Sequence, residues 1–302
     1  MTWLVLGATG LFGQAVLKAL ARRGVSAVGC ARKNADIDAD LSDPRQARTV
    51  LGDVRADVVV NAAAITSLDA CEANPPGAFA LNAALPEVLT GVCKGRKTKL
   101  VQISTDHFYA GDGSRLHDER FPVMVLNHYA RTKHAGEAFA ACVPGAFVMR
   151  TNITGARGWA GRPTFAEWAF DALENRKPLN LFTDYYTSTV DAATAAAAMI
   201  DLVERDAAGL YNVAAREAAS KKDFVVALAE TQGIALDWAE DASVKSLSTP
   251  RADSCGLDVA KAENMLGRRL PTVRETAAAL ALQCGRTPKA DCAVQGEQVH
   301  AL

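Results

Sequence analysis

Tyr129 and Lys133 lie four residues apart in a stretch of helical character, and Thr105 follows an apolar run that predicts a strand. Four residues make about one helical turn, so the phenol and the ammonium project from the same face. The ammonium can lower the pKa of the phenol, which is otherwise about 10. The Thr105 hydroxyl could donate a hydrogen bond to a substrate oxygen as negative charge develops there. A tyrosine and a lysine one turn apart are common on helices, so this pair indicates a catalytic site only in combination with other motifs.

Glycines at a strand-to-helix junction supply the next signal. The apolar run Trp3–Leu6 leads into a glycine-rich turn, after which a stretch of helical period begins. The spacing G-x-x-G-x-x-G permits a tight turn and a close approach of the backbone to a pyrophosphate at the helix N-terminus. Together with Tyr129 and Lys133 it predicts a dinucleotide site in which the lysine also holds the nicotinamide ribose. The residues of this turn expected to contact the dinucleotide are Gly7, Thr9, Gly10, Leu11, Phe12 and Gly13.

The end of the second expected strand indicates which dinucleotide binds. An acidic residue there would accept a hydrogen bond from the 2′-hydroxyl of NAD, but Arg32 and Lys33 follow this strand. A guanidinium can grip the 2′-phosphate of NADP with two hydrogen bonds and stack on adenine. Two solvated surface cations would look the same in sequence. NADP(H) is the expected cofactor, and its other expected contacts are Asp40, Leu41, Ala62, Ala63, Ala64, Ser104, Tyr129 and Lys133.

Apolar runs alternate with amphipathic stretches in the first half of the chain, which is typical of a parallel sheet covered by helices. We expect a Rossmann-type, doubly wound α/β fold with ligands at the carboxyl ends of the strands. The expected strands are Trp3–Leu6, Ala27–Cys30, Asp57–Asn61, Leu100–Ser104 and Ala146–Arg150. The expected helices are Leu11–Arg23, Ala47–Leu51, Gly77–Cys93, Asn127–Ala141, Asp191–Glu204, Ser220–Gly233 and Leu257–Leu266.

Glycines and a proline after residue 155 indicate a loop that leads into a smaller C-terminal lobe. The expected NADP-binding domain covers residues 1–155 plus about 184–213. The expected substrate-binding lobe covers about 156–183 plus 214–285. Residues 286–302 have no apolar period and are expected to form a mobile tail.

Composition limits the classes of partner. The 302 residues include 33 Lys or Arg and 34 Asp or Glu, which gives no global field for nucleic acid or an anionic membrane. The first residues lack a signal-peptide pattern, and no apolar stretch has the length of a membrane span. The histidines lack ligand spacing, so no metal is expected. We expect a cytoplasmic protein with a small-molecule substrate, and a homodimer is compatible with the sequence.

Several segments resemble the extended short-chain dehydrogenase/reductase family and, within it, the dTDP-4-dehydrorhamnose reductase branch. The resemblance covers roughly residues 2–283. The segments that carry it are Gly7-Ala8-Thr9-Gly10-Leu11-Phe12-Gly13, Val60-Asn61-Ala62-Ala63-Ala64, Ile103-Ser104-Thr105-Asp106, Tyr129-Ala130-Arg131-Thr132-Lys133-His134-Ala135-Gly136-Glu137 and Arg251-Ala252-Asp253-Ser254-Cys255-Gly256-Leu257-Asp258, the last followed by Lys261 and Leu266-Gly267.

The resemblance implies that Thr105, Tyr129 and Lys133 are the catalytic set and that Asn82 supports them. Tyr129 would donate a proton while NADPH delivers hydride to C4 of a nucleoside-diphosphate 4-keto-6-deoxysugar. Two arginines in or near the second lobe could meet the sugar's pyrophosphate, and Trp168 could face a ring or belong to the core of that lobe. The candidate substrate contacts are Thr66, Asp106, His107, Asn152, Arg162, Trp168 and Arg251.

Two departures from the branch leave the sugar open. His107 stands where an aromatic residue usually follows Thr-Asp, and Thr151-Asn152-Ile153 replaces the tryptophan often found after Arg-Thr-Ser. Related dehydratases carry Glu directly after Thr-Asp, so His107 argues against dehydration. A nucleotide-sugar epimerase with a retained cofactor uses the same Thr, Tyr and Lys. A non-catalytic NADP-binding regulatory subunit would tolerate loss of Tyr129 or Lys133, and both are present.

Overall fold

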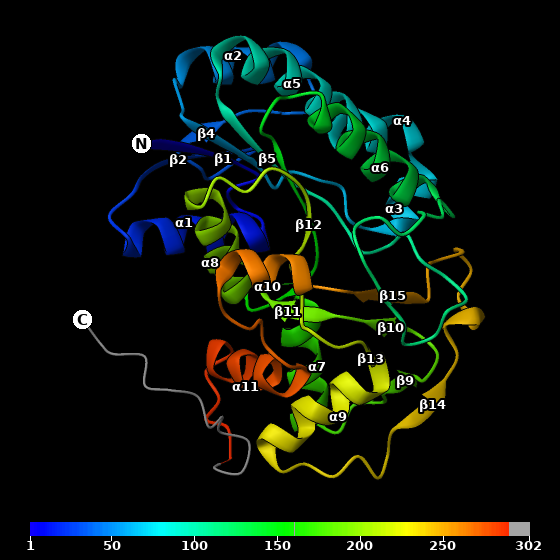
Figure 1. Ribbon diagram of the computed structural model, residues 1–302. Helices are drawn as coiled ribbons and strands as arrows, with labels where there is room; N and C mark the ends of the chain where they lie inside the picture. The colour runs from blue at the N-terminus through cyan, green and yellow to red at the C-terminus, as the bar shows by residue number, and fades with distance from the viewer. Residues whose placement is uncertain (160, 290–302) are drawn as a thin grey trace.

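The structure is a computed structural model that describes residues 1–159 and 161–289 (Figure 1). Its centre is a seven-stranded sheet in the order β12-β7-β5-β4-β1-β2-β3, in which all neighbouring strands are parallel. The order reverses between β1 and β4, and ligands bind doubly wound folds at such a switch point. The strands are β1 (Thr2–Leu6), β2 (Ser26–Ala31), β3 (Ile37–Asp38), β4 (Val58–Asn61), β5 (Lys99–Ile103), β7 (Phe147–Arg150) and β12 (Gly209–Asn212).

The central strands are buried on both faces. All four residues of β4 are buried, as is β1 from Trp3 to Leu6. A parallel sheet covered by helices excludes water from both sides, which explains the uninterrupted apolar runs. Leu6 pairs with Cys30 of β2 and Asn61 of β4, so these three strands end level with one another. The loops that carry the expected ligand contacts therefore begin at one edge of the sheet.

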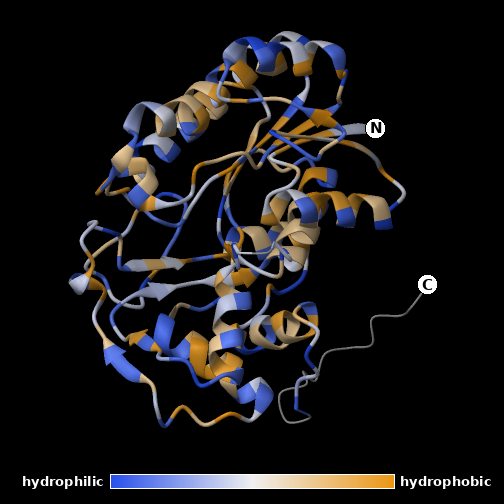
Figure 2. Ribbon diagram, turned by 180° about the vertical axis from the view of Figure 1, so that it is seen from behind, coloured by the Kyte–Doolittle hydropathy of each residue, from blue (hydrophilic) through white to orange (hydrophobic). Residues whose placement is uncertain are grey.

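Helices pack on each face and enclose two separate apolar clusters. Helices α1 (Leu11–Arg22) and α8 (Ala192–Glu204) lie together on one face, while α2 (Pro44–Asp53), α5 (Leu85–Arg96) and α6 (His128–Ala141) cover the other (Figure 1). Figure 2 shows hydrophobic residues along the strands of the sheet. The doubly wound α/β fold expected from the sequence is confirmed.

The stretch expected as one helix over Gly77–Cys93 consists of three consecutive pieces. They are α4 (Pro75–Phe79), a π-helical turn η1 (Ala80–Ala84) and α5. A π-helical turn widens the helix locally, and such turns are frequent at functional sites. Asn82 lies in this turn and is buried.

A second group of elements lies beyond the carboxyl ends of the sheet and packs round its own apolar cluster (Figure 1). Its helices α7 (Phe165–Glu174), α9 (Lys221–Gln232) and α11 (Val273–Gln283) each begin with a capping box that satisfies two backbone N–H groups. The other short elements of the chain are α3 (Leu68–Ala73), β6 (Leu116–His117), β8 (Asn152–Thr154), β9 (Asn180–Phe182), β10 (Tyr186–Thr187), β11 (Thr189–Asp191), β13 (Ala219–Ser220), β14 (Glu240–Ala242), η2 (Val244–Ser246), β15 (Ser254–Leu257) and α10 (Ala260–Leu266).

Three local features differ from the sequence-based expectations. The helix expected from Leu257 begins at Ala260, because Ser254–Leu257 pairs with β6 and β10 as a strand. Strand β10, expected within the NADP-binding domain, pairs with β13 and β15. Arg286, expected in the tail, binds both carboxylate oxygens of Glu174 at 2.6 and 2.7 Å. The part of the expected tail from residue 290 onward lies outside the described residues.

Residues 1–159 and 161–289 contain neither a candidate membrane span nor a candidate metal site. None of their helices is both long and apolar enough to cross a membrane. Within the same residues, no group of three or more His, Cys, Asp or Glu side chains could hold a metal ion.

Candidate active site

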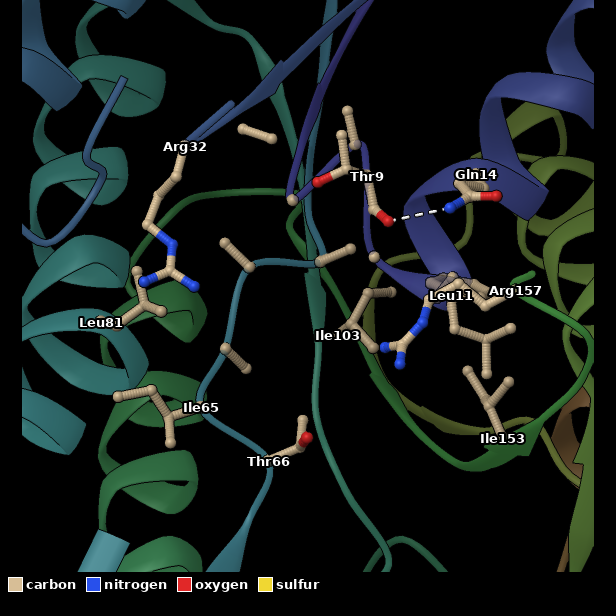
Figure 3. A pocket seen from close by; sticks show the side chains of 18 of the residues that line it. Thr9, Leu11, Gln14, Arg32, Ile65, Thr66, Leu81, Ile103, Ile153 and Arg157 are labelled. Carbon is tan, nitrogen blue, oxygen red and sulfur yellow. Dashed lines mark hydrogen bonds between the residues drawn. The ribbon is translucent and has the colours of Figure 1, made fainter. Parts of the chain in front are cut away.

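A cleft of about 1700 Å³ runs along the carboxyl ends of the central strands. Sites for drug-sized ligands have ~300–1,000 Å³, so this cleft has room for an extended dinucleotide and a second ligand. Figure 3 shows Arg32 and Leu81 on one side and Arg157 and Ile153 on the other. The expected site residues that line it are Gly7, Thr9, Gly10, Leu11, Phe12, Arg32, Lys33, Asp40, Leu41, Ala62, Ala63, Ala64, Thr66, Ser104, Thr105, Asp106, His107, Tyr129, Lys133, Asn152 and Arg162.

The glycine turn between β1 and α1 leaves a cradle that side chains would fill. Gly7 has φ +80°, and a Cβ there would lie 2.7 Å from the backbone nitrogen of Ala63. A Cβ on Gly13 would lie 2.2 Å from the carbonyl oxygen of Gly7, so this glycine lets α1 pack against the turn. Gly10 caps α1 without a side-chain hydrogen bond, and the first N–H groups of the helix stay available. The cradle therefore fits a pyrophosphate group.

Charged residues gather at the end of β2, on the expected adenosine side of the cleft. Arg32 and Lys33 are exposed there. Hydrogen bonds from Ser42 hold the pKa of Asp40 below its usual value, and the charge of Arg32 adds to this. Asp36, which the sequence did not predict as a site residue, also lines the cleft, and its Oδ2 accepts the N–H of Gly29 at 2.8 Å. The Arg32 guanidinium faces the cleft in Figure 3.

The expected catalytic groups converge at the ends of β5 and α6. Asn127 caps α6 by accepting the N–H of Ala130 at 2.8 Å, which starts the helix just before Tyr129. Lys133 is buried, and its Nζ donates to the carbonyl oxygen of Ile103 at 2.6 Å. Burial lowers the pKa of Lys133 to about 8. The lysine is thus anchored to the strand that carries Thr105, and it titrates close to neutrality.

The pKa of Tyr129 differs from the expectation. Burial raises this pKa well above its usual value, although a hydrogen bond with Thr105 opposes the rise. The Tyr129 ring packs with Cys71 and Ala78 and is 8% exposed. We expected Lys133 to lower the pKa of the phenol, but desolvation by the packed ring outweighs any such effect here. Tyr129 therefore keeps its proton at neutral pH.

Asn82 joins the loop after β4 to α6. Its Oδ1 accepts the N–H of Ile65 at 2.9 Å, and its Nδ2 donates to the carbonyl oxygen of Ile65 at 3.0 Å. The same Nδ2 lies 3.2 Å from Oγ1 of Thr132, which neighbours Lys133. Asn82 does not line the cleft, so it can support the catalytic residues only through the backbone it holds.

Asp106 and His107 lie beside Tyr129 and are both buried. The Asp106 Oδ2 accepts from Nδ2 of Asn152 at 2.7 Å, and its Oδ1 lies 3.3 Å from Oγ1 of Thr105. Burial raises the pKa of Asp106 to about 6. The His107 ring meets that of Tyr129 edge-on at 6.0 Å between centroids. Burial lowers the pKa of His107 to about 4, so this histidine is neutral near pH 7.

Two candidate substrate contacts lie outside the cleft lining. Trp168 is 40% exposed on α7, and its ring lies 5.8 Å from that of Phe165, which does line the cleft. The charge of Arg251 acts on His107, where it adds to the effect of burial in lowering the pKa of the histidine. Several other lining residues could not be predicted from the sequence, because they belong to irregular loops or to no motif. Among them are Gln14, Ile65, Arg157, Trp159 and Tyr185.

Comparisons with known proteins agree on one family. A family model described as RmlD substrate binding domain matches residues 1–284. The chain is 30% identical over 288 residues to the probable low-salt glycan biosynthesis reductase Agl14 of Haloferax volcanii, covering 91% of this chain and 96% of that protein. It is 28% identical to the dTDP-4-dehydrorhamnose reductase of Salmonella typhimurium, covering 83% and 85% of the two chains.

Solved structures show the same fold. A hypothetical dTDP-4-dehydrorhamnose reductase from Sulfolobus tokodaii superposes with a TM-score of 0.79 at 25% identity, covering 90% of this chain and 97% of that one. The dTDP-4-dehydrorhamnose reductase of Bacillus anthracis, solved in complex with NADP, has a TM-score of 0.82 at 20% identity, covering 93% and 97%. The match to the family model over residues 1–284 shows that this chain belongs to the RmlD substrate-binding-domain family.

Proposed function

We propose that this protein is a reductase that uses NADPH to convert the 4-keto group of a nucleoside-diphosphate 6-deoxysugar to an alcohol. The main support is that Tyr129, Thr105 and Lys133 line the same cleft as the glycine turn before α1. The first N–H groups of that helix have no side-chain cap. The similarity to a protein described as a dTDP-4-dehydrorhamnose reductase supports the substrate class. Arg157 and Arg162, from the loop before α7, line the same cleft and could bind the sugar's pyrophosphate. We assign the substrate-binding role to the second lobe, which contains α7, α9 and α11.

The chain's own groups account for the steps of the reaction. NADPH, when bound, supplies a hydride to C4 of the sugar. The glycine cradle holds the pyrophosphate of the cofactor, and Arg32 pairs with its 2′-phosphate. Thr105 donates a hydrogen bond to the carbonyl oxygen, and that oxygen takes the phenolic proton of Tyr129 as the C=O π bond breaks. Lys133, anchored on Ile103, holds the nicotinamide ribose and stabilises the phenolate that remains.

A substrate screen tests this proposal directly. Absorbance of NADPH is followed with dTDP-, UDP-, GDP- and CDP-linked 4-keto-6-deoxysugars and with simple ketones and aldehydes. We expect turnover of at least one nucleotide sugar and none of comparable efficiency with simple carbonyls. Turnover of simple ketones alone would refute the assignment. Interconversion of sugars without loss of NADPH would identify an epimerase instead.

Replacing Arg32 with alanine should weaken NADPH binding more than NADH binding, by about 1 to 3 kcal/mol, because a charge-assisted hydrogen bond to the 2′-phosphate is lost. Both dissociation constants are measured by fluorescence titration. Arg48→Ala, which removes an exposed cation of α2 outside the cleft lining, is the matched control and should change neither constant. If Arg32→Ala weakened the binding of NADPH and NADH equally, Arg32 would not contact the 2′-phosphate and would be only a surface cation.

The alkaline side of the pH profile should report Lys133. Its pKa of about 8 in the ligand-free protein means that the ammonium is lost as pH rises through 8. Because kcat/KM reports groups of the free enzyme, kcat/KM should fall above about pH 8. The profile of kcat/KM for NADPH is recorded from pH 5 to 10 at a saturating concentration of the sugar. A constant kcat/KM up to pH 9.5 would show that the Lys133 charge is not required.

A further inference from the structure

Lys221, the first residue of α9 in the second lobe, places its ammonium group next to two aromatic residues that line the cleft, Phe165 and Tyr185. Its Nζ lies between 5.2 and 5.8 Å from the ring centroids of Phe165, Tyr185 and Phe224. Ring faces attract a cation, which favours the charged amine in this partly buried place. Burial lowers the pKa of Lys221, whereas the charge of Asp106 raises it. Lys221 and the Asp106 carboxylate therefore influence each other although they make no direct contact.

A chain of side-chain hydrogen bonds connects the two charges. Lys221 Nζ donates to Oγ1 of Thr189 at 3.3 Å, and the Thr189 hydroxyl donates to Oδ1 of Asn152 at 2.8 Å. The amide of Asn152 then presents Nδ2 to Oδ2 of Asp106 at 2.7 Å. Thr187 Oγ1, 2.9 Å from Thr189 Oγ1, fills the remaining acceptor position of that hydroxyl.

The direction of this chain follows from its first member. An ammonium group can only donate, so Thr189 accepts from Lys221. The Thr189 hydroxyl gives its own proton to Oδ1 of Asn152. The oxygen of the Asn152 amide is thereby committed as an acceptor, and its NH₂ group must face Asp106. Asp106 accepts the N–H of Asn152 on Oδ2 at 2.7 Å, and this bond favours the ionised form of the carboxylate. In the ligand-free protein the Thr105 hydroxyl lies 3.3 Å from Oδ1, but its single proton is assigned to the substrate oxygen during the reaction.

The other titratable groups that face Asp106 carry no charge near neutral pH. They are Tyr109 in the loop after β5, Tyr129 on α6, Tyr185 before β10 and Cys255 on β15. Burial raises the pKa of each of these phenols and of the thiol, so all keep their protons at pH 7. The neighbouring His107 is also neutral there. Lys221 is thus the cation that acts on Asp106 among these groups.

We propose that Lys221 is a positioning residue that, through Thr189 and Asn152, keeps Asp106 ionised and aimed as an acceptor for a hydroxyl group of the sugar. Asp106 lines the cleft beside Tyr129, where a donor hydroxyl next to the reacting carbon can reach it. The nature of the substrate in this inference rests on the proposed function, but the effect of Lys221 on the charge of Asp106 does not.

Lys221→Met removes the charge and keeps an unbranched apolar stem among the rings. Without the cation the pKa of Asp106, which is about 6, should rise. The acidic limb of the pH profile of kcat/KM for the sugar should therefore move up by about one pH unit. At pH 6 the ionised fraction of Asp106 should fall from about one-half to about one-tenth, so we expect KM for the sugar to rise about fivefold there, with kcat within about threefold of wild type. The alkaline limb and the NADPH dissociation constant should not change, because Lys133 and the glycine cradle are untouched.

Variants of neighbouring residues separate positioning from simple loss of structure. Lys222→Met is the matched control, since Nζ of Lys222 pairs with Asp241 at 2.7 Å and lies outside the chain of hydrogen bonds. Thr189→Val should reproduce the effect of Lys221→Met, and Thr189→Ser, which keeps the hydroxyl, should restore wild-type behaviour. An acidic limb that stays in place in both folded variants, Lys221→Met and Thr189→Val, would overturn the inference.

A titration of Asp106 by carboxyl-carbon NMR gives a readout that needs no substrate. The signal is assigned by its loss in Asp106→Asn, and its midpoint is compared between wild type and Lys221→Met. An upward shift supports the inference even if every sugar in the screen fails, in which case only the proposed function is refuted. An unchanged midpoint in a folded Lys221→Met protein overturns the inference whatever the substrate proves to be.

Discussion

Tyr129→Phe is expected to lower kcat by at least ~100-fold, because loss of a positioned general acid typically costs 10²- to 10⁴-fold. The ring of Tyr129 packs with Cys71 and Ala78, and phenylalanine preserves this packing. Removal of a hydroxyl from a buried place should therefore leave the melting temperature nearly unchanged. We expect the NADPH dissociation constant to change by less than about threefold. Steady-state kinetics, thermal unfolding and cofactor titration together test this expectation.

Tyr211→Phe is the matched control for the loss of a hydroxyl. Tyr211 is also buried, but it lies on the edge strand β12 and does not line the cleft. Its replacement should leave kcat at the wild-type value. If Tyr129→Phe also retains kcat near the wild-type value with the best nucleotide sugar, the proton comes from another donor and Tyr129 is not the general acid. A collapse of NADPH binding in Tyr129→Phe would instead make it a cofactor residue.

Gly13→Ala is the second variant for which we expect a large effect. The added Cβ would lie 2.2 Å from the carbonyl oxygen of Gly7 and 2.8 Å from Cα of Ala8. Both are backbone atoms, so α1 must move away from the glycine turn. Overpacking of this kind costs about 1–3 kcal/mol of folding free energy. The shift also displaces the N–H groups that receive the pyrophosphate, so NADPH affinity should fall at least ~100-fold.

Gly91→Ala gives the opposite expectation for the same chemical change. Gly91 lies in the interior of α5, and a Cβ there has no heavy atom within 4 Å among those considered. Alanine is favoured over glycine by about 1 kcal/mol inside a helix, so this variant should be slightly more stable and bind NADPH normally. Urea unfolding and cofactor titration of both variants make the comparison. Normal NADPH affinity in Gly13→Ala would show that the cradle does not bind the cofactor.

The local patterns of the sequence predicted the elements that carry the cleft. Strands β1 and β4 are buried on both faces, which explains why uninterrupted apolar runs located them. Tyr129 and Lys133 lie one helical turn apart, so their spacing predicted that both would project from the same face of the helix. The glycine turn is equally local, because its backbone geometry depends on neighbouring residues. These features are decided within a few residues and can be read from the chain.

Tertiary packing decided what those patterns could not. The pKa of Tyr129 depends on the burial of its ring by Cys71 and Ala78, and neither lies near it in sequence. The charge of Asp106 depends on Lys221, which reaches it from the second lobe through side chains on two different short strands. Desolvation and hydrogen-bond direction arise only when distant segments meet. The sequence by itself determined the fold and the groups of the cleft that lie in local motifs. The tertiary structure decided the protonation states of those groups, because burial sets the cost of charge.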